Sequence, residues 1–423
     1  MLLWVGAVGL LLSSLILSPA VRRIPAEPPV PGLTVGVTHT ERSADPWNPS
    51  AAVDRARGVL REVAPIQNQH LMGWGAANPE PRPGVYDFSS LDRRINMISA
   101  TGAEPVLTLC CAPDWMKGGK AGSTDWSRIE QAPDARHFQD FARLAARAAE
   151  RYPQVRHFVV WNELKGFFDH SRNTWDAAAY TDLYNRVYEA VKEVRPDALV
   201  GGPYVVFDSW ASETAGGHPS AVRGPWGILD QRPLDVVEYW LAHAVGADFV
   251  AVDGGTHTRD RGLIATDFAA TAKLTTATEW VRARTDLPIW WVEIDADCSD
   301  CASHPGSARR AAVMVEALVA VARAGASTAL LWGPQGNADG LSTGRSAALF
   351  SDTASREGGE ALPLARLLRL LHEPLRQDPY GVVTAWHPWN SLWTLTTPHW
   401  RVFWSPATGL RGPFSNESGM GGT

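Results

Sequence analysis

The sequence predicts an α/β protein whose main part is a (β/α)8 TIM barrel, with a small C-terminal β appendage. Short runs of strand length alternate eight times with longer segments of helical periodicity. The runs at 158–161 and 289–292 are apolar throughout, which is typical of parallel strands buried on both faces. No G-x-G-x-x-G turn follows an early strand, so a doubly wound open sheet fits less well than a closed barrel.

The alternation predicts one catalytic barrel over residues 33–375 of the 423-residue chain. Eight right-handed βαβ units of this length close into a barrel whose active site lies at the carboxyl ends of the strands. The predicted strands are 33–38, 66–75, 104–110, 157–163, 198–205, 248–253, 288–295 and 327–332. The predicted helices are 50–63, 89–98, 134–152, 176–195, 233–245, 268–284, 307–324 and 362–372.

The two ends of the chain differ in character from the barrel. Residues 1–20 are apolar up to Leu17 and then small, which predicts a signal peptide or a membrane anchor and hence an exported protein. No Lys or Arg precedes this run and Arg22 and Arg23 follow it, so cleavage and a retained anchor both stay open. Residues 21–32 form a Pro-rich spacer.

The C-terminal part predicts a short β appendage over residues 376–405. Three strands are expected there, at 382–386, 392–396 and 400–404. Three strands cannot form a sandwich alone, so we expect them to pack on the barrel. Residues 406–423 are rich in Gly, Pro and Ser and predict a flexible tail.

Composition excludes one class of partner and favours another. A formal net charge of −6 gives no basic surface for nucleic acid. The chain has 19 Trp, and flat indole faces pack well against the C–H faces of sugars, although most buried Trp residues serve the core. Nothing in the sequence predicts an oligomeric state.

The four cysteines fall in two pairs, Cys110–Cys111 and Cys298/Cys301. In an exported protein Cys298 and Cys301 could close a small disulfide loop. The adjacent pair is expected to supply small apolar side chains at a strand end, and a bridge from one of them to a cysteine elsewhere stays open. One C-x-x-C supplies only two ligands of the four that a structural zinc needs, so we expect neither a metal nor a cofactor.

Two glutamates end predicted strands at matching places. Glu163 follows Asn162 at the end of the fourth strand, and Glu293 ends the seventh. In a barrel these positions face each other across the mouth. Glycoside hydrolysis needs two carboxyl groups on either side of the scissile bond, one protonated and one ionised. The two glutamates therefore predict a glycosidase.

These motifs resemble those of the retaining glycoside hydrolases of clan A, most of all glycoside hydrolase family 39, the β-xylosidase and α-L-iduronidase group. Trp161-Asn162-Glu163 is similar to the acid/base motif after strand four, and Trp291-Val292-Glu293 to the nucleophile motif after strand seven. The turn Tyr86-Asp87-Phe88 before a helix is a further similarity. Lys165 stands where the group more usually has Pro or Asn nearby. The resemblance covers the layout from Leu33 to His372.

The resemblance implies a role for each candidate residue. Glu163 would be the general acid and then the base, and Glu293 the nucleophile of a double displacement. Asn162 would bind the sugar's 2-hydroxyl. His257 would orient the nucleophile. Aromatic and imidazole rings at strand ends would shape the sugar subsites, Trp332 as the floor and His70, Trp74 and Trp115 around it.

The expected activity is that of a β-xylosidase-like exo-glycosidase on an oligo- or polysaccharide. An endo-acting hydrolase of a cell-wall or exopolysaccharide is one alternative, because the loops 117–133 and 208–232 could build either a pocket or an open groove. A carbohydrate-binding barrel without catalysis is the other.

Overall fold

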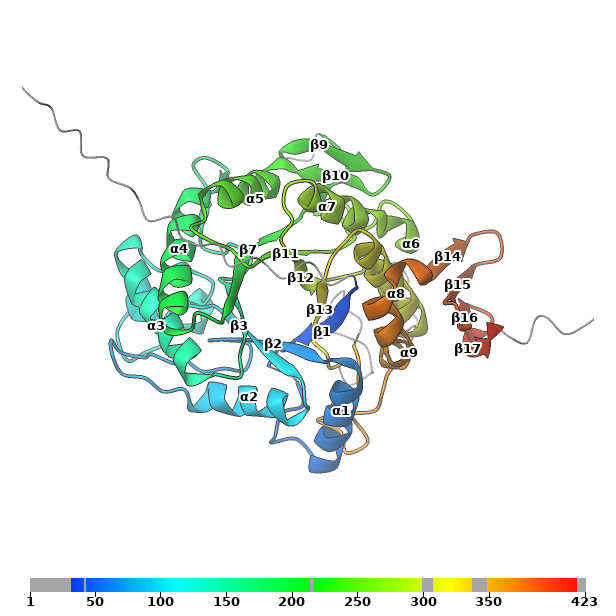
Figure 1. The fold of residues 1–423 in the computed structure, drawn as a ribbon, viewed down its shortest axis with the longest axis horizontal. Helices are drawn as coiled ribbons and strands as arrows, with labels where there is room; N and C mark the ends of the chain where they lie inside the picture. The colour runs from blue at the N-terminus through cyan, green and yellow to red at the C-terminus, as the bar shows by residue number, and fades with distance from the viewer. Residues whose placement is uncertain (1–31, 42, 214–216, 299–306, 337–347, 417–423) are drawn as a thin grey trace, which may run out of the picture.

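The computed structural model describes residues 32–41, 43–213, 217–298, 307–336 and 348–416. Eight parallel strands close into a barrel in the order β1-β13-β12-β11-β7-β4-β3-β2, with helices around it (Figure 1). This confirms the predicted (β/α)8 barrel. The barrel strands are β1 (Thr34–Thr38), β2 (Ile66–His70), β3 (Glu104–Leu109), β4 (His157–Val160), β7 (Leu199–Val206), β11 (Phe249–Gly254), β12 (Ile289–Ile294) and β13 (Thr328–Trp332).

The helices cover the outside of the barrel because each carries an apolar stripe at helical spacing. In the longest, Tyr180, Leu183, Val187 and Val191 are buried. The helices are α1 (Ser50–Val63), α2 (Ser89–Ala100), α3 (Phe138–Arg151), α4 (Ala177–Val194), α5 (Gln231–His243), α6 (Asp267–Ala270), α7 (Ala272–Arg282), α8 (Ser307–Arg323) and α9 (Pro363–Gln377).

Side chains that alternate along the strands fill the inside of the barrel. Val106, Val159 and Val292 belong to this inner cluster, together with Phe249 and Trp290. The neighbouring residues on the same strands point outward into the larger layer between strands and helices, as the twofold period of a strand requires. The barrel is therefore a packed core, and a ligand can enter only at its ends.

Several predicted elements have different limits in the structure. The second strand ends at His70 rather than at Gly75, because Gly73, Trp74 and Gly75 all take left-handed φ values of 81°, 46° and 94° that cannot continue a strand. The helix predicted at 268–284 divides into α6 and α7 around Thr271.

Two small sheets rise from the loops that follow β4 and β7. β5 (Phe168–Asp169) pairs with β6 (Thr174–Trp175), and β10 (Gly227–Asp230) lies between β8 (Ser209–Trp210) and β9 (Pro219–Gly224). Asp230 ends β10, caps α5 through the backbone N–H of Arg232, and holds the Arg232 guanidinium at 2.5 Å. The predicted loop 208–232 is thus an ordered hairpin over much of its length.

The C-terminal appendage is a four-stranded antiparallel sheet beside α8 and α9 (Figure 1). Its strands are β14 (Val383–His387), β15 (Leu392–Thr396), β16 (Trp400–Ser405) and β17 (Gly409–Ser415). The prediction of three strands and a flexible tail from residue 406 was wrong for β17. A Gly- and Pro-containing strand has a weak signal of its own, and this one forms because β16 offers an edge to pair with.

The cysteines pair differently from the expectation for the adjacent pair. Cys110 and Cys111 form a disulfide with each other at the end of β3, so neither bridges elsewhere. Cys298 is also disulfide-bonded. Cys301 lies outside the described residues, and its pairing with Cys298 stays a prediction.

The predicted signal peptide or anchor at 1–20 lies outside the described residues, as does the spacer up to residue 31. In the part of the chain that the structure describes, no helix has the length and apolarity needed to cross a membrane.

Candidate active site

Glu163 lies just beyond β4, in a backbone turn of unusual conformation. Trp161, Glu163 and Leu164 have positive φ values of 69°, 48° and 48°. Such left-handed conformations are strained for residues with a side chain and persist only where the surroundings hold them. Trp161 fixes this turn through its own contacts. It is fully buried, packs edge-on against Phe141, and its Nε1 donates to the Lys165 carbonyl at 2.8 Å.

Glu293 reaches the same mouth of the barrel through an irregularity in β12. Val292 belongs to the inner cluster, so strict alternation would turn Glu293 outward toward the helices. The pairing register shifts there, since Val252 pairs with Trp291 and Asp253 with Glu293. Such a bulge re-aims the side chains that follow it. Both Val292 and Glu293 can therefore face the barrel axis.

A second irregularity in β7 brings a phenol to Glu293. Tyr204 has a left-handed φ of 53°, and the register shifts past it, since Pro203 pairs with Ala251 and Val205 with Val252. The Tyr204 hydroxyl donates to Glu293 Oε2 at 3.2 Å. Burial, and after it the charges of Glu293 and Asp253, raises the pKa of Tyr204 well above its usual value, so this phenol is a neutral donor.

Three carboxyl groups meet at this point. Oxygen atoms of Glu163, Asp253 and Glu293, one from each, lie within 4.8 Å of one another. Asp253 is the last residue but one of β11 and is only 6% exposed. Three negative charges this close in a buried site repel one another strongly, so the group must retain protons.

The pKa values of the cluster reflect that repulsion. Burial, and after it the charges of Glu163 and Asp295, raises the pKa of Glu293 well above its usual range. Burial raises the pKa of Asp253 well above its usual range too, with Glu293 and Glu163 adding to it. The hydrogen bond from Tyr204 acts in the opposite direction on Glu293, because it favours the ionised carboxylate.

Asn162 is fixed from both sides. Its Oδ1 accepts from His70 Nε2 at 3.1 Å, and its Nδ2 donates to Glu163 Oε1 at 3.3 Å. Burial lowers the pKa of His70 to about 4, so the ring is neutral near pH 7 and its proton is on Nε2. The His70 ring in turn lies 4.2 Å from the Trp74 ring, centroid to centroid.

Lys165 brings a positive charge to the same carboxyl. Its Nζ lies 3.1 Å from Glu163 Oε1 and 2.6 Å from Glu130 Oε1. This ammonium offsets part of the negative charge of the cluster.

The comparisons with known proteins agree with this geometry. Residues 75–328, more than half of the chain, match the model of the glycosyl hydrolases family 39. The chain belongs to this family. No curated protein sequence matches it.

Solved structures of family 39 members share the fold at low sequence identity. The family 39 glycoside hydrolase of Bacteroides cellulosilyticus WH2 is 16% identical with a TM-score of 0.54, over 88% of this chain and 70% of that one. The family 39 enzyme of Xanthomonas axonopodis pv. citri is 17% identical with a TM-score of 0.54, over 93% and 76%. A monomeric β-xylosidase of Caulobacter crescentus CB15 is 17% identical with a TM-score of 0.54, over 92% and 76%.

In this family 39 barrel the structure brings most of the predicted site residues together. His70, Trp74 and Trp332 form one ring cluster, in which Trp332 lies edge-on to both others at 6.1 Å. The cluster joins the carboxyls through the hydrogen bond from His70 to Asn162.

Two predicted site residues lie differently. Trp115 contacts the ring of His137 and donates from Nε1 to the Glu80 carbonyl at 2.9 Å, and both of these partners belong to the segments around it. His257 lies three residues beyond β11, and Tyr204 donates a hydrogen bond to Glu293. A subsite role for Trp115 and an orienting role for His257 stay predictions.

Sequence reasoning missed Asp253 and Tyr204. Asp253 carried a usable signal, because it ends an apolar strand as Glu163 and Glu293 do. Tyr204 carried none: a Tyr in a strand next to Pro203 gives no hint of a bulge that directs its hydroxyl to a residue 89 positions away.

Proposed function

We propose that this family 39 glycoside hydrolase is a retaining enzyme that acts by double displacement. The observation that supports it is the approach of Glu163 and Glu293, whose carboxylate oxygens come within 4.8 Å. Carboxyl groups about 5–5.5 Å apart are typical of retention, whereas inverting enzymes leave about 6.5–9.5 Å for a water molecule.

In the proposed reaction Glu293 attacks the anomeric carbon while Glu163 protonates the departing oxygen. Water then enters on the side of Glu163, gives its proton to that carboxylate, and releases the sugar with its original anomeric configuration. The hydrogen bond from Tyr204 favours the ionised form of the attacking carboxylate, and Asn162 offers a donor for the 2-hydroxyl. The contact of Asn162 with the 2-hydroxyl gains strength as charge develops at the anomeric carbon.

We propose an exo-acting, β-xylosidase-like specificity. A solved structure with the same fold is a β-xylosidase, which makes xylose the first sugar to test. A panel of aryl glycosides, with EDTA as a control, identifies the sugar. The enzyme should turn over one or a few of these substrates and should be insensitive to EDTA. No turnover on any glycoside would favour a binding barrel instead.

Two variants test the assigned roles. Glu293→Ala should abolish turnover, and added azide should restore formation of a glycosyl azide of inverted configuration. Glu163→Ala should lower the rate for poor leaving groups far more than for activated aryl glycosides, because only the former need a proton. Equal losses on both kinds of substrate would contradict the acid role of Glu163.

We also propose that the protein is exported, by signal-peptide cleavage or with a retained anchor. The disulfide between Cys110 and Cys111 and the bonded state of Cys298 support an oxidising compartment. Cell fractionation followed by N-terminal sequencing tests this. A protein found in the cytosol with residues 1–20 intact would contradict it.

A further inference from the structure

Lys165 lies between two carboxyl groups, and the proposed reaction uses only one of them. Its Nζ is 2.6 Å from Glu130 Oε1 and 3.1 Å from Glu163 Oε1. All three side chains are partly exposed, at 32% for Lys165, 48% for Glu130 and 22% for Glu163, so water weakens both ion pairs. One ammonium is therefore shared by the proposed acid/base and by a second carboxylate to which the reaction assigns no role.

The turn after β4 fixes the backbone of Lys165. Its N–H donates to the Asn162 carbonyl at 3.0 Å. Gly166 follows with a φ of 81°, and a Cβ at that position would come within 2.1 Å of the backbone nitrogen of Ala132. Because Gly166 has no side chain, the segment that carries Glu130 packs directly against this turn.

A buried lysine holds the segment that carries Glu130. The side chain of Lys117 is 0% exposed, and its Nζ donates to the carbonyls of Arg128 at 2.8 Å and Ile129 at 3.3 Å. These two residues immediately precede Glu130 in the chain. Lys165 therefore lies between two anchored segments, and its pairing with both carboxyl groups follows from the fold.

Lys165 keeps its positive charge in this position. Burial lowers the pKa of Lys165, but the charge of Glu163 and the hydrogen bond and charge of Glu130 outweigh it, so that the pKa is above its usual value. The charge of Lys165 also acts on Glu293. There burial dominates, and Lys165 lowers the pKa less than the hydrogen bond from Tyr204 does. Lys165 thus contacts the acid/base directly and is a minor influence on the nucleophile.

The proposed double displacement moves a negative charge from one glutamate to the other and back. In the first step Glu293 bonds to the anomeric carbon and loses its charge, the glycosidic C–O bond breaks, and the proton of Glu163 goes to the departing oxygen. In the second step the oxygen of water bonds to the anomeric carbon, its proton goes to Glu163, and Glu293 is released as a carboxylate. Glu163 is ionised only between the two steps, so an ammonium in contact with it favours the covalent intermediate.

We propose that Lys165 is a positioning residue that compensates the charge on Glu163 as this acid gives up its proton, and that Glu130 holds the ammonium while Glu163 is protonated. Each transition state carries only part of the charge on Glu163. Stabilisation by Lys165 therefore speeds the first step and slows the second. Glu130 limits both effects, because it competes for the same ammonium. This inference rests on the proposed function.

Two aryl glycosides of the sugar that the substrate panel selects separate the two steps. A phenyl glycoside needs a proton on its leaving oxygen, so its kcat/KM measures the first step. A 2,4-dinitrophenyl glycoside does not, and its kcat measures the second step when a burst of dinitrophenol precedes the steady state.

Lys165→Met should lower kcat/KM on the phenyl glycoside about tenfold or more, because the ionising acid loses a contact with a charged group. It should leave kcat on the dinitrophenyl glycoside unchanged or raise it. Lys165→Arg should restore most of the first-step rate, because it keeps the positive charge. Lys192→Met is the matched control and should leave all rates unchanged. Lys192 pairs with Asp248 at 2.9 Å, before the amino end of β11 and away from the mouth of the barrel.

The second step distinguishes charge compensation from a merely structural role. If the substitution of Lys165 by Met only misplaced Glu163, both steps would become slower, because the same carboxyl group is the acid in one and the base in the other. Equal losses on the two substrates, or no loss on the phenyl glycoside, would overturn the role of Lys165 and leave the hydrolase intact. Thermal unfolding of each variant confirms that it is folded.

Glu130→Gln tests the sharing of the ammonium. Without the competing carboxylate, Lys165 should hold ionised Glu163 more tightly, and kcat on the dinitrophenyl glycoside should fall several-fold. An unchanged or higher kcat would contradict the role of Glu130. Failure of the wild-type enzyme on every aryl glycoside, or a product of inverted configuration, would instead overturn the proposed function and this inference with it.

Discussion

At the scale of single residues, the proposed reaction requires that the three carboxyl groups of the cluster differ in protonation state. Glu293 has to be ionised to attack, yet burial and its acidic neighbours raise its pKa. The pKa of Asp253, which is 6% exposed, is raised in the same way, but the proposed reaction does not require Asp253 to ionise. Because two adjacent buried carboxyls do not both ionise readily, we infer that Asp253 holds the proton and so leaves the charge to Glu293.

Asp253→Asn tests that division. The amide imitates a protonated carboxyl, so the variant should keep kcat/KM within about tenfold of the wild-type value, whereas Glu293→Gln should lose about 10⁴-fold or more. Steady-state kinetics on an activated aryl glycoside measures both. A loss in Asp253→Asn as large as that in Glu293→Gln would show that Asp253 acts as a charged group.

Tyr204→Phe tests the hydrogen bond to the proposed nucleophile. The bond favours the ionised form of Glu293, so its loss should raise the pKa of that carboxyl. Activity needs the ionised form, and the acidic limb of the pH dependence of kcat/KM should therefore move to higher pH. A hydrogen bond to a charged group contributes about 1.5–3 kcal/mol, which corresponds to about a 10- to 100-fold loss at pH values below the shifted limb. An unmoved limb would contradict the assignment.

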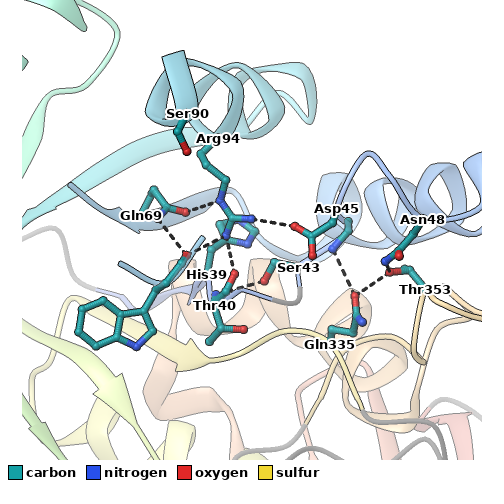
Figure 2. Close-up of polar contacts among 12 residues, drawn as sticks. His39, Thr40, Ser43, Asp45, Asn48, Gln69, Ser90, Arg94, Gln335 and Thr353 are labelled. Atoms are coloured by element: carbon teal, nitrogen blue, oxygen red, sulfur yellow. Dashed lines mark hydrogen bonds and ion pairs between the residues drawn. The ribbon is translucent and has the colours of Figure 1, made fainter. Parts of the chain in front are cut away.

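At the scale of elements, the bulges in β7 and β12 and the left-handed turn after β4 direct the site residues, while α2 supports the turn after β2. Arg94 leaves α2 on its buried face and joins Asp45, Gln69 and the Trp74 carbonyl (Figure 2). The ion pair of Arg94 and Asp45 is almost fully buried, with side chains 8% and 4% exposed. Arg94 thereby connects α2 to the left-handed turn that carries Trp74.

Arg94→Met should therefore destabilise the protein. It leaves the Asp45 carboxylate buried without its partner, which costs about 3–5 kcal/mol. Arg93→Met is the matched control, because Arg93 is the preceding residue on the same helix and is exposed; its effect should stay within about 0.5 kcal/mol. Urea unfolding followed by tryptophan fluorescence measures both. Equal effects of the two substitutions would mean that the ion pair carries no stability.

At the scale of the whole molecule, the C-terminal sheet is joined to the barrel by stacked aromatic rings. Phe268 of α6 lies 4.6 Å from the ring of Trp386, and Trp393 donates from Nε1 to Glu316 of α8 at 2.9 Å. Trp393 is fully buried. The sheet is too small for a core of its own, and its stability depends on this contact.

Trp393→Ala should accordingly destabilise the whole protein in one transition. Truncation of a fully buried Trp costs about 3–5 kcal/mol, and the change should appear equally in far-UV circular dichroism and in activity loss on heating. Trp389→Ala, in the exposed turn between β14 and β15, should change the free energy of unfolding by less than about 0.5 kcal/mol. Separate transitions for the sheet and the barrel in the variant would show instead that the two fold independently.

The sequence by itself determined the barrel and the order of its strands. The spacing of apolar residues along the sequence indicates which face of a strand or helix is buried, and this spacing can be read within each element by itself. The same logic placed Glu163 after the fourth barrel strand and Glu293 on the seventh. It failed for β17, because a strand with a weak pattern of its own depends on the edge that a neighbour offers.

Only the tertiary structure decided how the site is assembled. A register shift in β12 turns Glu293 inward, and another in β7 brings Tyr204 to it. The pattern of residues predicts neither shift, because each arises from pairing between strands that are distant in sequence. The pairing of Cys110 with Cys111 and the approach of Glu130 and Lys165 to Glu163 were decided in the same way, by which loops meet at the mouth of the barrel.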